Sequence, residues 1–245
     1  MPDSADALYE KVCQHARETA LLSSIEALLG WDERCLMPAA AAEYRAEQMT
    51  LLSGMMHSRQ TDPQLGEWLG ALAEAASAAE PASDRGATLR QLKRQFDKKT
   101  RLPKKLVEEL TRTSVLGQQA WQNAKESNDY GSFAPLLKKT IELKREQAEA
   151  VGYAECPYDA LLDDFEPNEL TSNLQRVLGG LRDELTPLVA AIRDSGRQAD
   201  ISLLKRRFPV AAQEAFGRRA AAAIGFDFER GRLDVTAHPF CTAPG

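Results

Sequence analysis

Histidine and cysteine are the side chains here that could bind a transition metal or serve as base and nucleophile. The chain contains His15, His57, His238, Cys13, Cys35, Cys156 and Cys241. A zinc site needs three or four nitrogen, sulfur or carboxylate ligands that converge on one point. No histidine is followed by glutamate and then by a second histidine four residues on, so the sequence lacks the helical His-Glu-x-x-His motif. We therefore expect this chain to bind no metal by itself.

Other catalytic patterns are equally absent from the sequence. Cys13 and His15 are two residues apart, which places them on different faces of a helix, so they form a weak ligand pair. There is no Gly-x-Ser-x-Gly nucleophile turn and no glycine-rich phosphate loop. The chain thus offers no catalytic residue of its own.

The segment from Gly231 to Phe240 differs from the helical pattern that precedes it. Its apolar residues alternate with charged ones between 232 and 235, which predicts a short extended segment. Pro239 keeps His238 out of the helical region. A lone exposed histidine usually has no function, but one held by proline could donate a hydrogen bond to a substrate carboxylate or to a tetrahedral intermediate.

Two further segments allow both a structural and a functional interpretation. Trp31-Asp32, followed by Met37-Pro38, reads as a loop between helices or as the wall of a substrate cleft. The acidic connector 157–167 contains Asp159, Asp163, Asp164 and Glu166. Its spacing does not fit a calcium loop, so a solvated or capping role is favoured.

The elements that must position these residues are helices. Apolar residues recur at helical spacing, proline stands at helix starts, and glycine stands at helix ends. The first two expected helices cover about 6–29 and 39–57. The third begins at Pro63 and fades before Pro81, the fourth is capped at Ser83, the fifth begins at Leu102-Pro103, and the sixth runs from Ser132 to Gly152. The last two cover 170–193, with a break or kink at Pro187, and 210–224. Small residues at Ser114 and Gly117 suggest the close approach of another helix. We expect a mainly all-α, antiparallel helical array with one short extended segment near the C-terminal end.

Composition narrows the possible partners. The net charge is −5 and the pI is about 5.4, which argues against nucleic acid because phosphate binding needs a concentrated basic face. No apolar run approaches the ~20 residues that a membrane span requires, and the N-terminus lacks the apolar core of a signal peptide. The cysteines read as reduced thiols. A cytoplasmic protein without a membrane or nucleic-acid partner is expected.

Several motifs together resemble the carboxypeptidase Taq family of metallocarboxypeptidases. They are the Trp31-Asp32 segment with Met37-Pro38 and the following Arg45 and Gln48, the run 158–167, and Asp234 followed by His238-Pro239-Phe240. The resemblance implies a helical fold whose N-terminal helices form a lid over a deep cleft. It further implies a homodimer that removes single residues from peptide C-termini with zinc or cobalt as cofactor.

The family's Asp-x-Arg-Ile-Thr-Thr segment, its His-Glu-x-x-His helix and its carboxylate ligand do not occur in this sequence. We therefore interpret residues 1–245 as one helical region, the lid and cleft wall of a larger metallocarboxypeptidase, and expect it to be inert alone. His238, Pro239 and Phe240 are the predicted substrate-binding residues. The alternative is a non-catalytic helical protein-interaction module.

Overall fold

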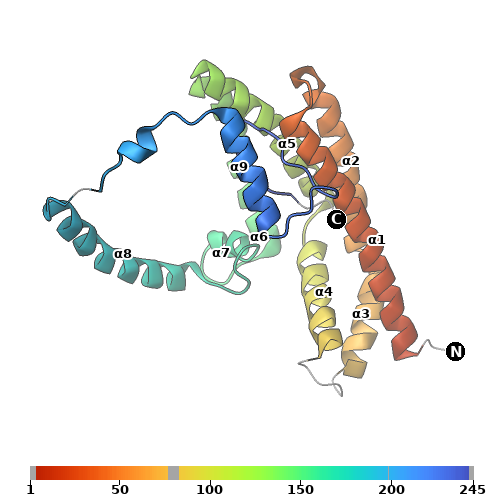
Figure 1. The fold of residues 1–245 in the computed structure, drawn as a ribbon. Coiled ribbons are helices and arrows are strands. Elements are labelled where there is room, and N and C mark those ends of the chain that lie inside the picture. The colour runs from red at the N-terminus through yellow and green to blue at the C-terminus, as the bar shows by residue number, and fades with distance from the viewer. Residues whose placement is uncertain (1–3, 77–82, 198, 243–245) are drawn as a thin grey trace. The chain divides into compact units, whose positions relative to one another are not determined.

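The computed structural model describes residues 4–76, 83–197 and 199–242, and the regular structure in them is helical (Figure 1). The helices are α1 (Ala5–Cys35), η1 (Ala39–Ala41), α2 (Ala42–Gln60), α3 (Pro63–Ala76), α4 (Asp84–Thr100), α5 (Lys104–Ser127), α6 (Tyr130–Val151), α7 (Pro157–Leu162), α8 (Thr171–Asp194), η2 (Ser202–Lys205) and α9 (Val210–Ala223). The mainly all-α prediction is confirmed. The chain forms two compact units, Met1–Glu169 with Ala237–Gly245, and Leu170–Thr236.

In the first unit the helices pack as neighbouring pairs. α2 packs against α5 and α1, α5 against α6, α1 against α3, and α3 against α4, while α7 packs on α6. Only two residues connect α5 to α6, so these packed helices must run antiparallel. Two apolar clusters result. One contains Leu102, Leu106, Leu143, Ala148, Val151 and Ala160, and the other contains Val12, Leu69, Leu72 and Leu89.

Side-chain caps set several helix starts in this unit. The Ser83 hydroxyl accepts a hydrogen bond from the Gly86 amide at 3.1 Å, which confirms the predicted cap of α4. Asn128 adopts a left-handed conformation (φ 53°) and ends α5, and the Asp129 carboxylate then caps α6 by accepting from the Ser132 amide. The turn is therefore tighter than predicted, and α6 begins at Tyr130 instead of Ser132.

The first helix is longer than the sequence predicted. Gly30 lies inside α1, which continues to Cys35, so the expected left-handed cap at Gly30 and the loop at Trp31-Asp32 are wrong. A glycine inside a helix costs only about 1 kcal/mol relative to alanine, and the packed last turn offsets that. Pro187 likewise lies within α8 without ending it.

The predicted extended segment near the C-terminal end is also wrong. Residues 231–236 are irregular, and no strand occurs among the residues that the structure describes. Alternating side chains predict a strand only where a neighbouring strand supplies hydrogen bonds to its backbone. The alanine-rich stretch 77–82 and residues 243–245 lie outside the described ranges.

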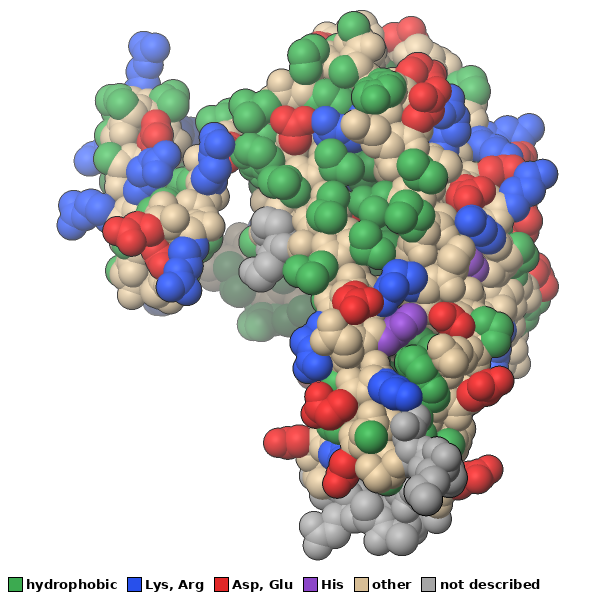
Figure 2. All heavy atoms as spheres, turned by 90° about the vertical axis from the view of Figure 1, so that its right-hand side faces the viewer, with side chains coloured by type: hydrophobic (Ala, Val, Ile, Leu, Met, Phe, Trp, Pro, Cys, Tyr) green, Lys and Arg blue, Asp and Glu red, His purple; other side chains and the backbone are tan. Residues whose placement is uncertain are grey.

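The two units differ in what they bury. The second unit, which contains α8, η2 and α9, has no buried residue among those described. The first unit has its two cores but also exposes large apolar residues, among them Leu21, Ile25 and Leu28 of α1. Hydrophobic side chains gather on the face shown in Figure 2. Within the described ranges, no helix has the length and apolarity needed to cross a membrane.

Two glycines of α3 provide a matched test of this packing. A Cβ added at Gly66 would lie 2.7 Å from the Phe96 ring of α4, whereas one added at Gly70 would meet nothing within 4 Å. Gly66→Ala should lower the free energy of unfolding by about 1–3 kcal/mol through overpacking. Gly70→Ala should raise it by about 0.5–1 kcal/mol through helix propensity. Urea unfolding followed by circular dichroism measures both, and equal effects would contradict the α3–α4 contact.

Candidate functional site

The His238-Pro239-Phe240 segment belongs to the first unit, although it follows the second unit in sequence. The His238 ring meets the Trp121 ring of α5 edge to face, with centroids 6.0 Å apart and an interplanar angle of 72°. The Arg34 guanidinium, in the last turn of α1, lies 4.8 Å from the centroid of the Phe240 ring. The segment is therefore held between residues that are more than 100 positions away in sequence.

One ring nitrogen of His238 is already engaged. Nδ1 lies 2.9 Å from the carbonyl oxygen of Pro239. A carbonyl can only accept, so Nδ1 carries the hydrogen and donates it. In the neutral ring Nε2 is then an acceptor, and in the protonated ring it is a second donor. The residue is exposed, so Nε2 is the atom of His238 that could meet a ligand.

Two cations accompany the aromatic rings of this site. Besides Arg34 over Phe240, the Lys125 ammonium lies 5.0 Å from the centroid of the Trp121 ring. A cation over a ring face contributes about 0.5–1 kcal/mol at exposed sites. These positive charges and the imidazole suit a carboxylate better than a cationic ligand.

Arg45 fixes the turn that carries Arg34. Its Nη2 donates to the Asp32 carboxylate at 2.6 Å, and its Nη1 donates to the Leu29 carbonyl oxygen at 2.5 Å. Its Nε donates to Gln48 Oε1 at 3.1 Å. The Arg45 side chain is only 12% exposed, so these partners compensate most of its lost hydration. Asp32, Arg45 and Gln48 of this motif therefore link α1 to α2.

Glu33 lies in the same turn and is half-buried. Burial raises the pKa of its carboxyl group, and the charges of Arg34 and Arg45 oppose that rise. The last turn of α1 therefore holds two carboxyl groups in different surroundings, one of which is paired directly with a guanidinium.

The acidic connector holds α4 and α7 together and forms no cation site. Asp159 is buried and accepts from the amides of Glu155 and Cys156 at 3.1 and 3.0 Å, which confirms its capping role. Asp163 instead pairs with Arg94 at 2.5 Å and with Lys98 at 2.8 Å, while Asp164 pairs with Lys98 at 2.6 Å. Of the two expected roles, solvated or capping, the solvated one is wrong for Asp163, which also accepts a hydrogen bond from the Asn168 amide at 3.0 Å.

These contacts determine the acidity of Asp163. Burial raises the pKa of its carboxyl group, but the hydrogen bonds from Lys98 and from the Asn168 amide, with the charges of Lys98 and Arg94, lower it to about 2. The carboxylate is thus charged at neutral pH and is committed to protein cations.

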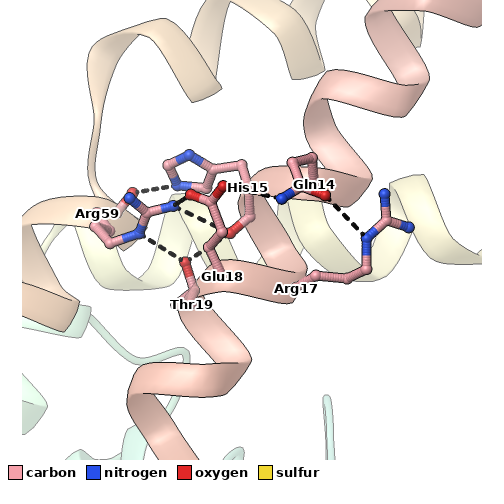
Figure 3. A network of polar contacts seen from close by, with 6 residues as sticks. All are labelled: Gln14, His15, Arg17, Glu18, Thr19 and Arg59. Atoms are coloured by element: carbon pink, nitrogen blue, oxygen red, sulfur yellow. Dashed lines mark hydrogen bonds and ion pairs between the residues drawn. The ribbon is translucent and has the colours of Figure 1, made fainter.

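His15 belongs to a polar network that joins α1 to α2 (Figure 3). Its Nε2 donates to the Arg59 carbonyl oxygen at 2.9 Å. The Arg59 guanidinium returns to α1, where it contacts Glu18 Oε2 at 2.7 Å and Thr19 Oγ1 at 3.3 Å. His15 therefore has a structural role in the polar network that joins α1 to α2.

His57 is buried on α2, and its Nδ1 has no hydrogen-bond partner in the part of the chain that the structure describes. Burial lowers the pKa of its imidazole, a backbone hydrogen bond at Leu102 opposes that, and Lys99 and Lys104 lower it further. His57 is thus a neutral ring inside the helix packing.

No metal site emerges from these residues. Across 4–76, 83–197 and 199–242 there is no group of three or more histidine, cysteine, aspartate or glutamate side chains that could hold an ion. The residues present do not fit the divalent metal of a metallopeptidase.

The sequence indicated His238 and Phe240 but missed the residues they contact. Trp121 and Arg34 could not be predicted as contacts, because a periodic pattern cannot reveal a contact with a segment more than 100 positions further along the chain. The close helix approach predicted at Gly117 is wrong, because a Cβ there would meet nothing within 4 Å.

Comparisons with known proteins agree on one family. The family model "Carboxypeptidase Taq (M32) metallopeptidase" matches residues 11–244. The chain is 36% identical to thermostable carboxypeptidase 1 of Thermus thermophilus over 98% of its own length and 49% of the relative's. It is 31% identical to carboxypeptidase 1 of Bacillus subtilis over 90% and 44%. The chain therefore spans about half the length of the curated relatives it matches.

Solved structures give the same result. The crystal structure of BsuCP superposes with a TM-score of 0.90 at 29% identity, covering 97% of this chain and 48% of that one. The M32 carboxypeptidase from Deinococcus radiodurans R1 gives a TM-score of 0.76 at 34% identity, covering 98% and 47%.

The Asp163 network predicts a pH-dependent stability difference. Lowering the carboxyl pKa from 3.8 to about 2 stabilises the fold, and after allowance for solvent screening we expect Asp163→Asn to cost roughly 1 kcal/mol at neutral pH. Because the folded-state pKa is the lower one, this stability is complete above about pH 4 and is lost as the pH falls toward about 2. Urea unfolding at several pH values measures the difference.

Asp164→Asn is the matched control, since within the described ranges Lys98 is the only ion-pair partner of Asp164, whose side chain is 46% exposed. Asp164→Asn should lower the free energy of unfolding by less than half as much as Asp163→Asn does. If Asp163→Asn lowers the free energy of unfolding as much at pH 2 as at neutral pH, this stability does not come from the Asp163 carboxylate.

Proposed function

Because the chain belongs to the carboxypeptidase Taq (M32) family of metallopeptidases, we propose that it is the N-terminal part of a metal-dependent carboxypeptidase. The enzyme hydrolyses single residues from peptide C-termini. The observation that carries the proposal within this chain is the His238-Pro239-Phe240 segment, held against α1 and α5 by Arg34 and Trp121. It supports a site that binds substrate and does not itself break the bond.

His238, Pro239 and Phe240 are the proposed substrate-binding residues. Pro239 accepts the Nδ1 hydrogen of His238 and so fixes the ring. With Nδ1 engaged in this way, Nε2 is the ring atom left to meet a substrate carboxylate, and it would donate to one when the ring carries a proton on both nitrogens. Phe240 contributes an apolar wall that is itself fixed beneath the Arg34 guanidinium.

The metal belongs to the complete enzyme in this proposal. We propose zinc, or cobalt, which when bound would supply an activated water and a Lewis acid. The described residues offer no ligand set for it, so no step of the hydrolysis is assigned to them. This chain would contribute substrate binding and exclusion of water.

The proposal extends to assembly and location. The complete enzyme would be a homodimer in the cytoplasm that acts on peptide substrates, and the first unit would form its lid and cleft wall. The acidic balance, with a net charge of −5, disfavours a nucleic-acid partner.

A second candidate is a helical protein-interaction module without catalysis. The two apolar clusters of the first unit favour it, since they could stabilise that unit alone. A monodisperse chain that unfolds cooperatively would support this candidate, whereas aggregation through exposed apolar surface supports the partial enzyme.

We predict that the 245-residue chain alone releases no C-terminal residue from peptides, with or without added zinc or cobalt, because its described residues bring no set of metal ligands together. Mass spectrometry of a peptide mixture provides the measurement. The positive control is a joined chain, in which these 245 residues precede the half of the Thermus thermophilus relative that they do not match. Metal-dependent release by the 245-residue chain contradicts the proposal.

Within the joined chain, His238→Ala should lower kcat/KM for peptides by roughly 10- to 100-fold, because one charge-assisted hydrogen bond to the substrate is lost. Cys241→Ala is the control, since Cys241 is exposed and lies beyond the segment's contacts. Its kcat/KM should not change. Wild-type kinetics in His238→Ala would remove His238 from the proposed site.

A further inference from the structure

α8 carries an apolar stripe that its own unit leaves uncovered. Large side chains recur every three or four residues, so they lie on one side of the helix. They are Leu178, Leu181, Leu185, Leu188, Val189 and Ile192. Each of them is between 44% and 62% exposed. Asp183 lies on the opposite side of α8 and its side chain is 71% exposed, which provides a reference position on the same helix.

This stripe is not needed for packing inside the second unit, because that unit has no buried residue among those described. Isolated helices are marginally stable in water, and most helical stability in proteins comes from burial of an amphipathic face. A 24-residue amphipathic helix without a cover is therefore incomplete as a stable structure. The exposed residues of α1 differ, because α1 already contributes Val12 to a core.

The relatives indicate what covers the stripe. The BsuCP structure matches 97% of this chain, yet the chain covers only 48% of that structure. The matched fold thus occurs together with about as much further polypeptide. Contiguous apolar surface of this kind marks an interface, and a layered helical fold buries such a stripe against another helix.

We propose that the α8 stripe is the docking surface for the half of the family fold that this chain does not match. The occupant presents an apolar helical face to Leu181 and Leu185. This inference rests on family membership and on the exposed stripe, and it does not depend on the substrate role of His238.

Thiol labelling measures directly whether another part of the protein covers the α8 stripe. Leu185→Cys is placed in the stripe and Asp183→Cys on the opposite side of α8, each in the 245-residue chain and in the joined chain. The proteins react with a maleimide, and peptide mapping separates the label at 185 or 183 from labels on the four native cysteines. We expect Leu185→Cys to react about tenfold or more slowly in the joined chain than in the 245-residue chain. Asp183→Cys should react at similar rates in both.

If something other than the unmatched half of the fold covers the stripe, the labelling rates differ from those expected. Slow labelling of Leu185→Cys already in the dilute 245-residue chain would mean that this chain covers its own stripe, and slowing that grows with protein concentration would indicate a second copy. Equal rates in both chains would leave the stripe open. Each of these overturns the proposal, whereas an inactive joined chain with a protected Leu185→Cys would overturn only the proposed catalysis.

A second pair of variants tests the same surface without thiols. Leu181→Asp with Leu185→Asp should lower the Tm of the joined chain clearly more than that of the 245-residue chain. Arg176→Asn with Asp183→Asn changes two exposed residues on the opposite side of α8 and should affect both chains alike. If both pairs of substitutions lower the Tm of the joined chain equally, the α8 stripe is not the docking surface.

Discussion

The guanidinium of Arg45 determines how the first two helices meet. Its three donors engage the Leu29 carbonyl, the Asp32 carboxylate and the Gln48 amide, so it ties the end of α1 to the start of α2. An arginine that is mostly removed from water is tolerated only with such partners, and loss of one partner leaves a costly unpaired charge. Because α1 continues as a helix through this contact, Arg34 projects from its last turn. Arg34 in turn covers Phe240.

This chain of contacts explains why a segment far along the sequence belongs to the first unit. Trp121 and Arg34 contribute from α5 and α1, and neither helix alone could hold residues 238–240. An irregular segment has no backbone ladder to order it, so aromatic and cation–ring contacts must fix its position. The imidazole, whose Nδ1 faces the Pro239 carbonyl oxygen, contacts the Trp121 ring, and the Lys125 ammonium lies over that same ring.

The sequence predicted well what local physics decides. Helix periodicity and the Ser83 cap follow from side chains within a few residues. It failed where distant groups decide. Gly30 reads as a helix end until Arg45 is placed against Leu29, and residues 232–235 read as a strand although no strand lies beside them. Asp163 reads as a solvated carboxylate because Arg94 and Lys98 are more than 60 positions away.

The residues of the candidate site likewise divide into those that the sequence can identify and those that it cannot. His238 and Phe240 could be identified from their motif, whereas Trp121, Arg34 and Lys125 could not, since their relevance arises only from the packing of α1 and α5. The division also separates two kinds of chemistry. A substrate-binding surface can be assembled from side chains that a half-length chain supplies, because each contact contributes on its own. A metal centre requires all of its ligands at one point, and no such set exists in the described part of this chain. A polypeptide that matches about half the length of its metallopeptidase relatives can therefore fix an irregular segment against two helices and expose an apolar stripe on a third, although its described residues bring no metal-ligand set together.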